Sequence, residues 1–509
     1  MNSDDKRYLK QLIETIDRFS AENIHDKCEH PVDGEITNFL KDVENKLSED
    51  PFDLFRFKGR LLEFWKRLIE KSIACLRYFD SREPFISAAD NSKKPYAYGV
   101  QNLYEYFRKY NDFENLLYGG SEYYRDHVIH VFRVWIIGTD ILLRENANFL
   151  NKIEIAKGFE YNGWEKLSVW TIIAMTHDLG YPLEKSMKIM DKTKDMMKCF
   201  VQNPIISMDL SFSGVQNQMN DFVIRFMSSK MWKAKNTKDI MIEGNENGEN
   251  EKDLYVARLQ PKFYFKFQKS LEQNMHGVLS SLLIYKMLLY FLESDYSTNE
   301  DYVFDKEDAR QFYMRREILR AISSHTCHDV YQLHLYSFSL LLIIADDAQE
   351  WGRKQISELY VQKETDYEFK GISLNGEAND TTCTMNEQYT ISTNQQFKQI
   401  IKQFVRISLG YNDWFRDGQD TEKRDFNFNK ITKITVKSGG ADKDLTFSLC
   451  ITKQAASTIE INMNINQCEK ARLTDIIKGV LGEDPQVTGN DKYTYCVMDV
   501  KRYCEADKN

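Results

Sequence analysis

The sequence predicts a mainly helical protein with a smaller α+β domain at its C-terminal end. Only eight prolines interrupt the 509 residues. From residue 4 to about residue 350, apolar residues recur at three- and four-residue spacing, the period of helices that bury one face. Beyond about residue 362, Asn, Thr, Ser and Gly become frequent and apolar residues alternate, as they do in half-buried strands.

In the helical region, the clearest predicted helices are Leu54–Tyr78, Val128–Leu143, Trp170–His177, Met275–Phe291, Arg315–Ser324 and Leu333–Asp346. Gly180 and Pro182 follow the third of them as stop signals. The polar stretch at 236–253 predicts an exposed loop or insertion.

In the C-terminal region, strands are expected at Lys433–Lys437, Leu445–Ile451 and Ile459–Ile465, and helices at Asn394–Ile407 and Gln467–Leu481. These patterns divide the chain into an N-terminal helical region at 1–118, a second helical region at 119–360 with an insertion at about 188–273, and an α+β domain at 362–509.

Composition excludes several classes of protein. A formal net charge of −9 argues against strong nucleic-acid binding, while small anionic ligands are still allowed. No apolar run approaches the roughly 20 residues needed to span a membrane, and the N-terminus lacks the pattern of a secretory signal. The nine cysteines contain no C-x-x-C pair, which is typical of reduced thiols. We therefore expect a cytoplasmic protein without a membrane partner.

The chemistry is expected where histidine and aspartate interrupt apolar helices. His127 and His130 are three residues apart and share one helical face. His177 and Asp178 end the apolar stretch WTIIAMTHD. A buried carboxylate without a partner costs several kcal/mol, and a divalent metal shared by His177 and Asp178 would remove that cost.

His276, His325 and Asp346 occupy similar apolar settings. Any one of these histidines is more often a satisfied core or surface residue, but accidents rarely repeat the same setting in several helices. Imidazole and carboxylate ligands suit Mn, Fe, Co, Ni or Zn, with Mg as a further candidate. The set predicts a site for one or two divalent ions.

The order His130, His177-Asp178, His276, His325, Asp346 resembles that of the HD superfamily of metal-dependent phosphohydrolases. The opening pattern of that family is matched by His130, Arg133 and Val134, and Leu179-Gly180 follows the doublet as it usually does. The resemblance covers roughly residues 120–355 and not the C-terminal domain. The triphosphohydrolase branch often has Gly-His after the doublet, whereas this chain has Gly180-Tyr181-Pro182.

The resemblance implies an HD-type all-helical catalytic domain and a ligand set of His130, His177, Asp178, Asp346, His276 and His325. Asp178, His276 and His325 are the expected catalytic residues. Either His276 and His325 bind a second metal bridged by Asp178, or they act as acid and phosphate contacts. A metal of this kind lowers the pKa of a coordinated water toward about 7, which suits phosphoester hydrolysis.

Substrate contacts are expected from His127, Arg125, Lys185 and Lys266. His127 is a candidate ligand, phosphate contact or core residue, since the triphosphohydrolase branch tends to place a phosphate-contacting Arg there. Further candidate cations are Arg133, Lys188, Arg315 and Arg316. The run from Lys262 to Lys269 interleaves lysines with aromatics and could grip a nucleotide, or form an amphipathic element with a solvated face.

The expected activity is metal-dependent hydrolysis of a nucleotide phosphate bond, first of all by a deoxynucleoside triphosphate triphosphohydrolase in nucleotide-pool control or antiviral (phage) defence. Alternatives are a phosphodiesterase or pyrophosphohydrolase of cyclic or signalling nucleotides, an HD-type di-iron oxygenase, and a binding module with a degenerate site. The partners considered are a nucleotide substrate, a nucleotide effector, a second copy of the chain and a defence-complex protein.

Overall fold

A computed structural model describes most of the helical region and the strands that follow it. The described residues are 2–25, 30–48, 54–78, 98–117, 126–144, 149–156, 158–199, 214–233, 254–294, 296, 303–327, 329–330 and 336–349, together with the strands at 368–376, 382–391, 427–436, 445–452, 458–462, 486–487 and 492–496. The expected loop at 236–253 and the expected helices at 394–407 and 467–481 lie outside these residues.

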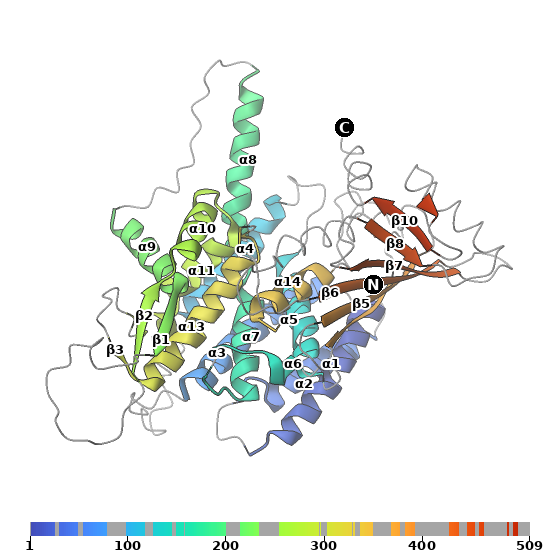
Figure 1. The fold of residues 1–509 in the computed structure, drawn as a ribbon, viewed down its shortest axis with the longest axis horizontal. Coiled ribbons are helices and arrows are strands. Elements are labelled where there is room, and N and C mark those ends of the chain that lie inside the picture. The colour runs from blue at the N-terminus through green and yellow to red at the C-terminus, as the bar shows by residue number, and fades with distance from the viewer. Residues whose placement is uncertain are drawn as a thin grey trace.

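The structure is mainly helical, as the sequence predicts (Figure 1). The helices are α1 (Asn2–Glu22), α2 (Gly34–Lys46), η1 (Leu54–Phe57), α3 (Lys58–Tyr78), α4 (Val100–Leu117), α5 (His127–Leu143), α6 (Phe149–Lys152), α7 (Gly163–Thr176), α8 (Tyr181–Met197), α9 (Gly214–Ser228), α10 (Pro261–Glu272), α11 (His276–Met287), α12 (Leu289–Leu292), α13 (Lys306–Ser324) and α14 (Phe338–Ala348).

Helices α5 and α7 form the middle of the core. Every residue of α5 is buried, and so is every residue of α7 from Leu167 to Thr176. The two helices pack closely at Gly138, where a Cβ atom would lie only 1.8 Å from the ring of Trp170. Glycine is therefore required at this crossing, and the crossing fixes where the two helices end.

The N-terminal helices belong to the same core. Tyr8 and Leu12 of α1 are buried in one hydrophobic cluster with α5. The Arg133 guanidinium donates to both carboxylate oxygens of Asp5, with Nε–Oδ1 at 2.8 Å and Nη2–Oδ2 at 2.7 Å. Because both side chains are buried, this bidentate pair fixes α1 against α5. Arg133, expected near the substrate, is thus engaged in the core instead.

A small sheet interrupts the helical region, which the periodicity of the sequence did not predict. Its strands are β1 (Ser229–Lys233), β2 (Tyr255–Leu259) and β3 (Val303–Phe304). They pair antiparallel in the order β1-β2-β3. Strands of 5, 5 and 2 residues are too short for alternation to stand out from the surrounding helical pattern.

A second sheet follows the helices. Its strands are β4 (Glu368–Gly376), β5 (Thr382–Ile391), β6 (Asn427–Val436), β7 (Leu445–Thr452), β8 (Thr458–Asn462), β9 (Gln486–Val487) and β10 (Lys492–Cys496). Their order is β4-β5-β6-β7-β8-β10-β9, with β5 parallel to β6 and all other pairs antiparallel. Figure 1 shows this sheet beside α1. Among the described residues, no helix is long and apolar enough to cross a membrane.

Candidate metal centre

Five histidines and two aspartates meet where several helices begin or end. They are His127 and His130 in the first turn of α5, His177 and Asp178 directly after α7, His276 at the first position of α11, His325 directly after α13, and Asp346 in α14. The α5 and α7 members are buried, whereas the residues of α11, α13 and α14 are half-buried. The cluster is therefore more open on the side of these three helices.

One oxygen of Asp178 faces the histidines of α5 and α7. Its Oδ2 lies 3.5 Å from Nε2 of His130 and 3.5 Å from Nε2 of His177. Nε2 of His127 is 3.7 Å from the same oxygen. His127 therefore belongs to the cluster, and its Nε2 is directed toward Asp178 in the same way as Nε2 of the predicted ligands.

The other oxygen of Asp178 faces α11 and α13. Its Oδ1 lies 3.2 Å from Nε2 of His276 and 3.8 Å from Nε2 of His325. The two Nε2 atoms are 3.1 Å from each other. The carboxylate of Asp178 therefore stands between two groups of imidazole nitrogens, one at each oxygen.

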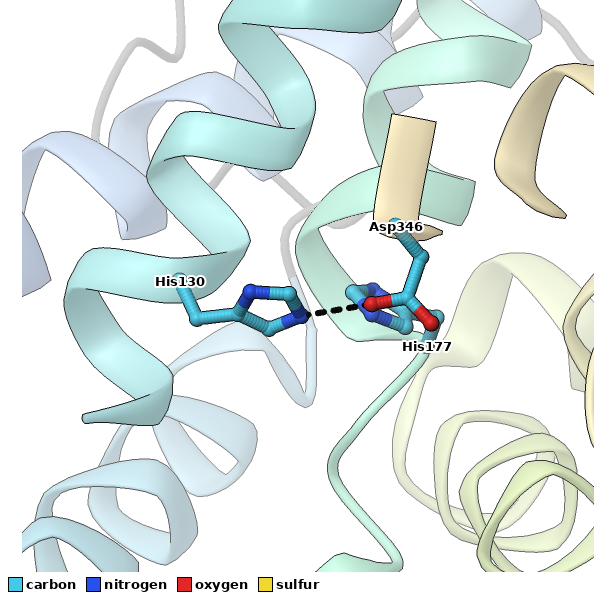
Figure 2. A group of neighbouring side chains, drawn as sticks. All are labelled: His130, His177 and Asp346. Atoms are coloured by element: carbon cyan, nitrogen blue, oxygen red, sulfur yellow. Dashed lines mark ion pairs between the residues drawn. The ribbon is translucent and has the colours of Figure 1, made fainter. Parts of the chain in front are cut away.

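Asp346 completes the group on the α5 side. Its Oδ1 lies 2.9 Å from Nε2 of His130, and Figure 2 shows both side chains directed toward His177. Ligand atoms of His130, His177 and Asp346 lie within 4.8 Å of one another, and so do those of His177, Asp178 and His325. His177 belongs to both groups.

Each of the five histidines uses its other ring nitrogen, Nδ1, to contact an acceptor. The acceptors are Glu114 Oε1 for His127 at 2.9 Å, Gln349 Oε1 for His130 at 2.6 Å, the Ala174 carbonyl for His177 at 2.8 Å, Glu184 Oε2 for His276 at 2.6 Å, and the Ile322 carbonyl for His325 at 2.5 Å. An acceptor at Nδ1 fixes the ring and leaves Nε2 available to a metal, the arrangement found around most ligating histidines.

The turn that carries Asp178 is held by neighbouring helices. Ser280 of α11 donates to the His177 carbonyl at 2.7 Å and accepts from the Gly180 amide at 2.7 Å. The Tyr106 hydroxyl donates to the Leu179 carbonyl at 2.7 Å. A Cβ atom on Gly180 would lie 2.4 Å from the carbonyl oxygen of His276. Glycine thus lets α11 approach closely enough to place His276 beside Asp178.

Burial and neighbouring charges set the protonation of the cluster. Burial alone would raise the pKa of Asp178, but His177 and the hydrogen bonds of His276 and His325 hold it well below its usual value. Burial lowers the pKa of His177. Asp178 is therefore a carboxylate and His177 a neutral imidazole at neutral pH, which are the forms that bind metal.

His276 and Glu184 form a charged pair. Burial lowers the pKa of His276, but Asp178 and Glu184 outweigh it and raise the pKa to about 9. Burial raises the pKa of Glu184, and the hydrogen bonds of His276 outweigh it and lower the pKa to about 2. In the protein without metal, a proton on His276 thus compensates part of the negative charge of Asp178 and Glu184.

The donor set fits a divalent transition metal. Nitrogen and oxygen ligands at about 2.1 Å from one ion are about 3 to 3.5 Å apart when they occupy adjacent positions. The distances from Asp178 to His130, His177 and His276 are 3.5, 3.5 and 3.2 Å. Nε2 of His177 is buried and has no hydrogen-bond partner among the described residues, an arrangement that is costly unless an ion takes that position.

Of the expected substrate contacts, His127 belongs to the cluster itself, and Lys185 lies beside it on α8. Its Nζ is 4.6 Å from the centre of the Tyr181 ring. The Tyr181 ring lies 4.2 Å from that of His127 and 5.4 Å from that of His276. Lys185 and Tyr181 thus stand at the start of α8 beside the metal ligands. Arg125 lies outside the described residues.

Lys266 is half-buried on α10, and its carbonyl accepts from the Cys327 thiol at 3.6 Å. Helix α10 buries Phe267 and leaves Phe265 67% exposed. The run of lysines and aromatics therefore lies on an amphipathic helix.

Two expected phosphate contacts lie in the core. The Arg315 guanidinium donates to the Tyr290 carbonyl at 2.6 Å, and Arg316 donates to the Ser229 carbonyl at 3.3 Å. Both are buried, because they satisfy carbonyl groups between α13 and its neighbours. Their guanidinium groups are therefore engaged in the core and not at the surface. Lys188 is exposed and pairs with Glu184.

Sequence reasoning missed the residues that orient the ligands. Glu114, Glu184 and Gln349 are 13, 92 and 219 residues from the histidines they contact. Neither spacing nor apolar context singled them out. The one sequence feature that could have found any of them is the position of Glu184, in the first turn of the helix that follows the His-Asp doublet.

No protein-family model, no curated protein and no solved structure matches this chain.

Proposed function

We propose that the chain is a metal-dependent phosphohydrolase that cleaves a nucleotide phosphate bond, and that its preferred substrate is a deoxynucleoside triphosphate. The observation that carries the proposal is the position of Asp178, whose two oxygens face His130 and His177 on one side and His276 on the other. This is the ligand order of the HD phosphohydrolases, which the sequence resembles. A metal held there supplies a Lewis acid for the phosphoryl oxygens and lowers the pKa of water.

The protein residues have separate roles in this proposal. His130, His177, Asp178 and Asp346 would hold one ion. Lys185 and His127 contact the phosphates, and Tyr181 between them limits the access of water. A Lys side chain is a suitable phosphate contact because its charge acts without a fixed geometry.

His276 and His325 decide between the two forms of the mechanism. If they bind no second ion, His276 is the group placed to donate a proton to the leaving oxygen, since its ring contacts Glu184 at 2.6 Å and Asp178 at 3.2 Å. If they held a second ion together with Asp178, both imidazoles would be neutral, and the ion would supply the positive charge that a protonated His276 otherwise carries.

A second candidate activity is favoured by the approach of His276 and His325 to the same oxygen of Asp178, at 3.2 and 3.8 Å. The members of the superfamily with six ligands include phosphodiesterases and pyrophosphohydrolases of cyclic and signalling nucleotides. The same ligand order also occurs in the di-iron oxygenases of this fold. Product identity distinguishes these activities.

The test is a hydrolysis assay of the purified chain with Mn, Mg, Co, Ni or Fe(II). The substrates are deoxynucleoside triphosphates, nucleoside triphosphates and cyclic or signalling nucleotides, alone and in mixtures. Tripolyphosphate released from a deoxynucleoside triphosphate would support the preferred substrate. Pyrophosphate or a linear dinucleotide would replace it with the second candidate.

Matched variants make this assay specific. Asp178→Asn and His177→Ala are expected to reduce turnover by at least about 100-fold, the size of effect found when electrostatic stabilisation is lost. His25→Ala is the control, because His25 is exposed and far from the ligand helices in sequence. Turnover that survives in Asp178→Asn, or oxygen consumption in place of hydrolysis, would overturn the proposal.

A further inference from the structure

A second candidate ligand site lies away from the metal centre, where β1, β2 and the start of α10 meet. A surface pocket of about 480 Å³ is lined there by Trp232, Arg258, Leu259, Gln260, Pro261 and Lys262. This volume is within the range of small-molecule sites. The lining contains an aromatic ring and two cations and no carboxylate.

The aromatic ring is available for stacking. Trp232 is 50% exposed, whereas the large side chains of Trp65, Trp135, Trp164 and Trp170 are among those fully buried. Lys230 is the neighbour of Trp232 on the exposed face of β1, with Nζ 4.8 Å from the centre of the indole ring. An exposed tryptophan beside a cation offers a planar surface with positive charge at one side.

Among the described residues, no acidic side chain lines the pocket together with its cations. Lys230 and Arg258 are direct partners in the register of β1 and β2, and both are exposed. Like charges directly opposite each other destabilise a sheet. Lys262 adds a third positive charge in the first turn of α10, which carries no acidic residue. An anion bound among them would remove this repulsion.

The start of α10 adds to the attraction for an anion. The side chain of Gln260, at its N-cap, makes no capping hydrogen bond. Pro261 and Lys262, the first two residues of the helix, line the pocket. A helix of 12 residues presents partial positive charge at this end.

We infer that this pocket binds a nucleoside polyphosphate, whose base stacks on Trp232 and whose phosphates lie among Lys230, Arg258 and Lys262. A nucleoside polyphosphate combines a planar group, which can stack on the tryptophan, with several negative charges, which can pair with the cations. Stacking tolerates any base because every base has a π face. The inference does not depend on the proposed hydrolysis, since none of these residues belongs to the metal cluster.

Two helices, α10 and α13, connect the pocket to His276 and His325 of the metal centre. Helix α10 runs from the pocket to Glu272, and α11 begins with His276 four residues later. Arg320, five residues before His325 on α13, donates to the Gln260 side chain at 3.4 Å and to the Met227 carbonyl at 2.9 Å. The start of α10 is therefore in contact with α13, the helix that precedes His325.

The test measures binding of ATP by calorimetry to the full chain in excess EDTA, so that turnover at the metal centre cannot contribute. The expected result is one site whose affinity falls about 10- to 100-fold in Trp232→Ala, the loss typical of one base stack, and falls also in Arg258→Glu. Adenosine alone and tripolyphosphate alone are each expected to bind more weakly than ATP, because each satisfies half of the pocket.

The controls are Trp232→Phe, which keeps a stacking ring and should retain most of the affinity, and Lys192→Glu, the same charge reversal at an exposed lysine of α8. Unfolding temperatures confirm that each variant is folded. Unchanged affinity in Trp232→Ala and Arg258→Glu would overturn the inference. So would a single-stranded oligonucleotide that binds much more tightly than ATP through Trp232, since the pocket would then be part of a nucleic-acid surface.

Discussion

At the scale of single residues, the orientation of each imidazole in the cluster is set by the contact that one of its two ring nitrogens makes. Hydrogen-bond acceptors fix Nδ1, and Nε2 is directed to Asp178 or Asp346. A core histidine that is merely satisfied needs no common target for its second nitrogen. Five rings directed at one carboxylate indicate a shared ligand, and residues such as Glu184 support that arrangement from behind.

The support from Glu184 can be measured. Glu184→Gln keeps the size of the side chain but removes the charge that holds His276, with Oε2 at 2.6 Å from Nδ1. We expect metal affinity or turnover to fall about 10- to 100-fold, as for other residues behind a ligand. Glu14→Gln on the exposed face of α1 is the matched control. Equal metal affinity in the two variants would show that Glu184 has no role in positioning.

Proton release on metal binding tests the role of His276. Its pKa is raised to about 9 in the protein without metal, so the ring is protonated at pH 7.5 and must lose this proton to become a ligand. Calorimetry at pH 7.5 in buffers of different ionisation enthalpy should show about one proton released per second ion. Above about pH 10 this release should vanish. Its absence at pH 7.5 would mean that His276 is not a ligand.

At the scale of elements, the site depends on how closely the central helices approach. Helix α5 carries His130 and α7 leads into His177 and Asp178, and the two cross at Gly138 and Trp170. Helix α11 meets the turn after α7 at Gly180. Small residues at these contacts set the distances between ligands, because a larger side chain would move a whole helix.

Gly138→Ala should show this effect. The added Cβ would lie 1.8 Å from the Trp170 ring, so the helices must separate or the ring must move. We expect a loss of about 1 to 3 kcal/mol in the free energy of unfolding and weaker metal binding. Gly59→Ala in α3 is the control, since nothing lies within 4 Å of its Cβ; it should be neutral or slightly stabilising. Equal stability of both variants in chemical denaturation would contradict the packing argument.

Sequence patterns predicted those helices that can be recognised from the residues within them. The apolar stretch at Val128–Leu143 is observed as α5, with a start that differs by one residue. This helix could be predicted because a helix that is buried on all sides carries apolar residues on all of its faces. Met275–Phe291 is divided into α11 and α12 at Leu288, which has an extended backbone. No pattern marks that break, and none marks Glu114 or Gln349, since their contacts are made only after folding brings distant segments together.

At the scale of the whole molecule, the metal cluster is contained within the helical part of the chain. The hydrophobic cluster extends from Tyr8 to Ala348, and the ligands and the residues behind them lie between Glu114 and Gln349. The seven-stranded sheet follows this part in sequence and contributes none of the contacts described at the cluster. Its role in the activity is open to a direct test.

A chain ending near residue 362 should remain folded and bind metal as the full chain does. Helical circular dichroism, a cooperative thermal transition and metal titration check this expectation. The same truncation carrying His177→Ala should fold and lose metal binding. Complete unfolding of the truncated chain would place the domain boundary elsewhere.

The central claim is that the histidines around Asp178, together with Asp346, hold a divalent metal, and the most direct measurement is the number of Mn²⁺ ions bound per chain, together with their electron paramagnetic resonance spectrum. The account predicts at least one bound ion in the wild-type chain and much weaker binding in Asp178→Asn; a second ion with a spin-coupled spectrum is expected if His276 and His325 hold one. Failure of the folded wild-type chain to bind Mn²⁺ or any other divalent transition metal, or a coupled pair that persists in Asp178→Asn, would contradict it.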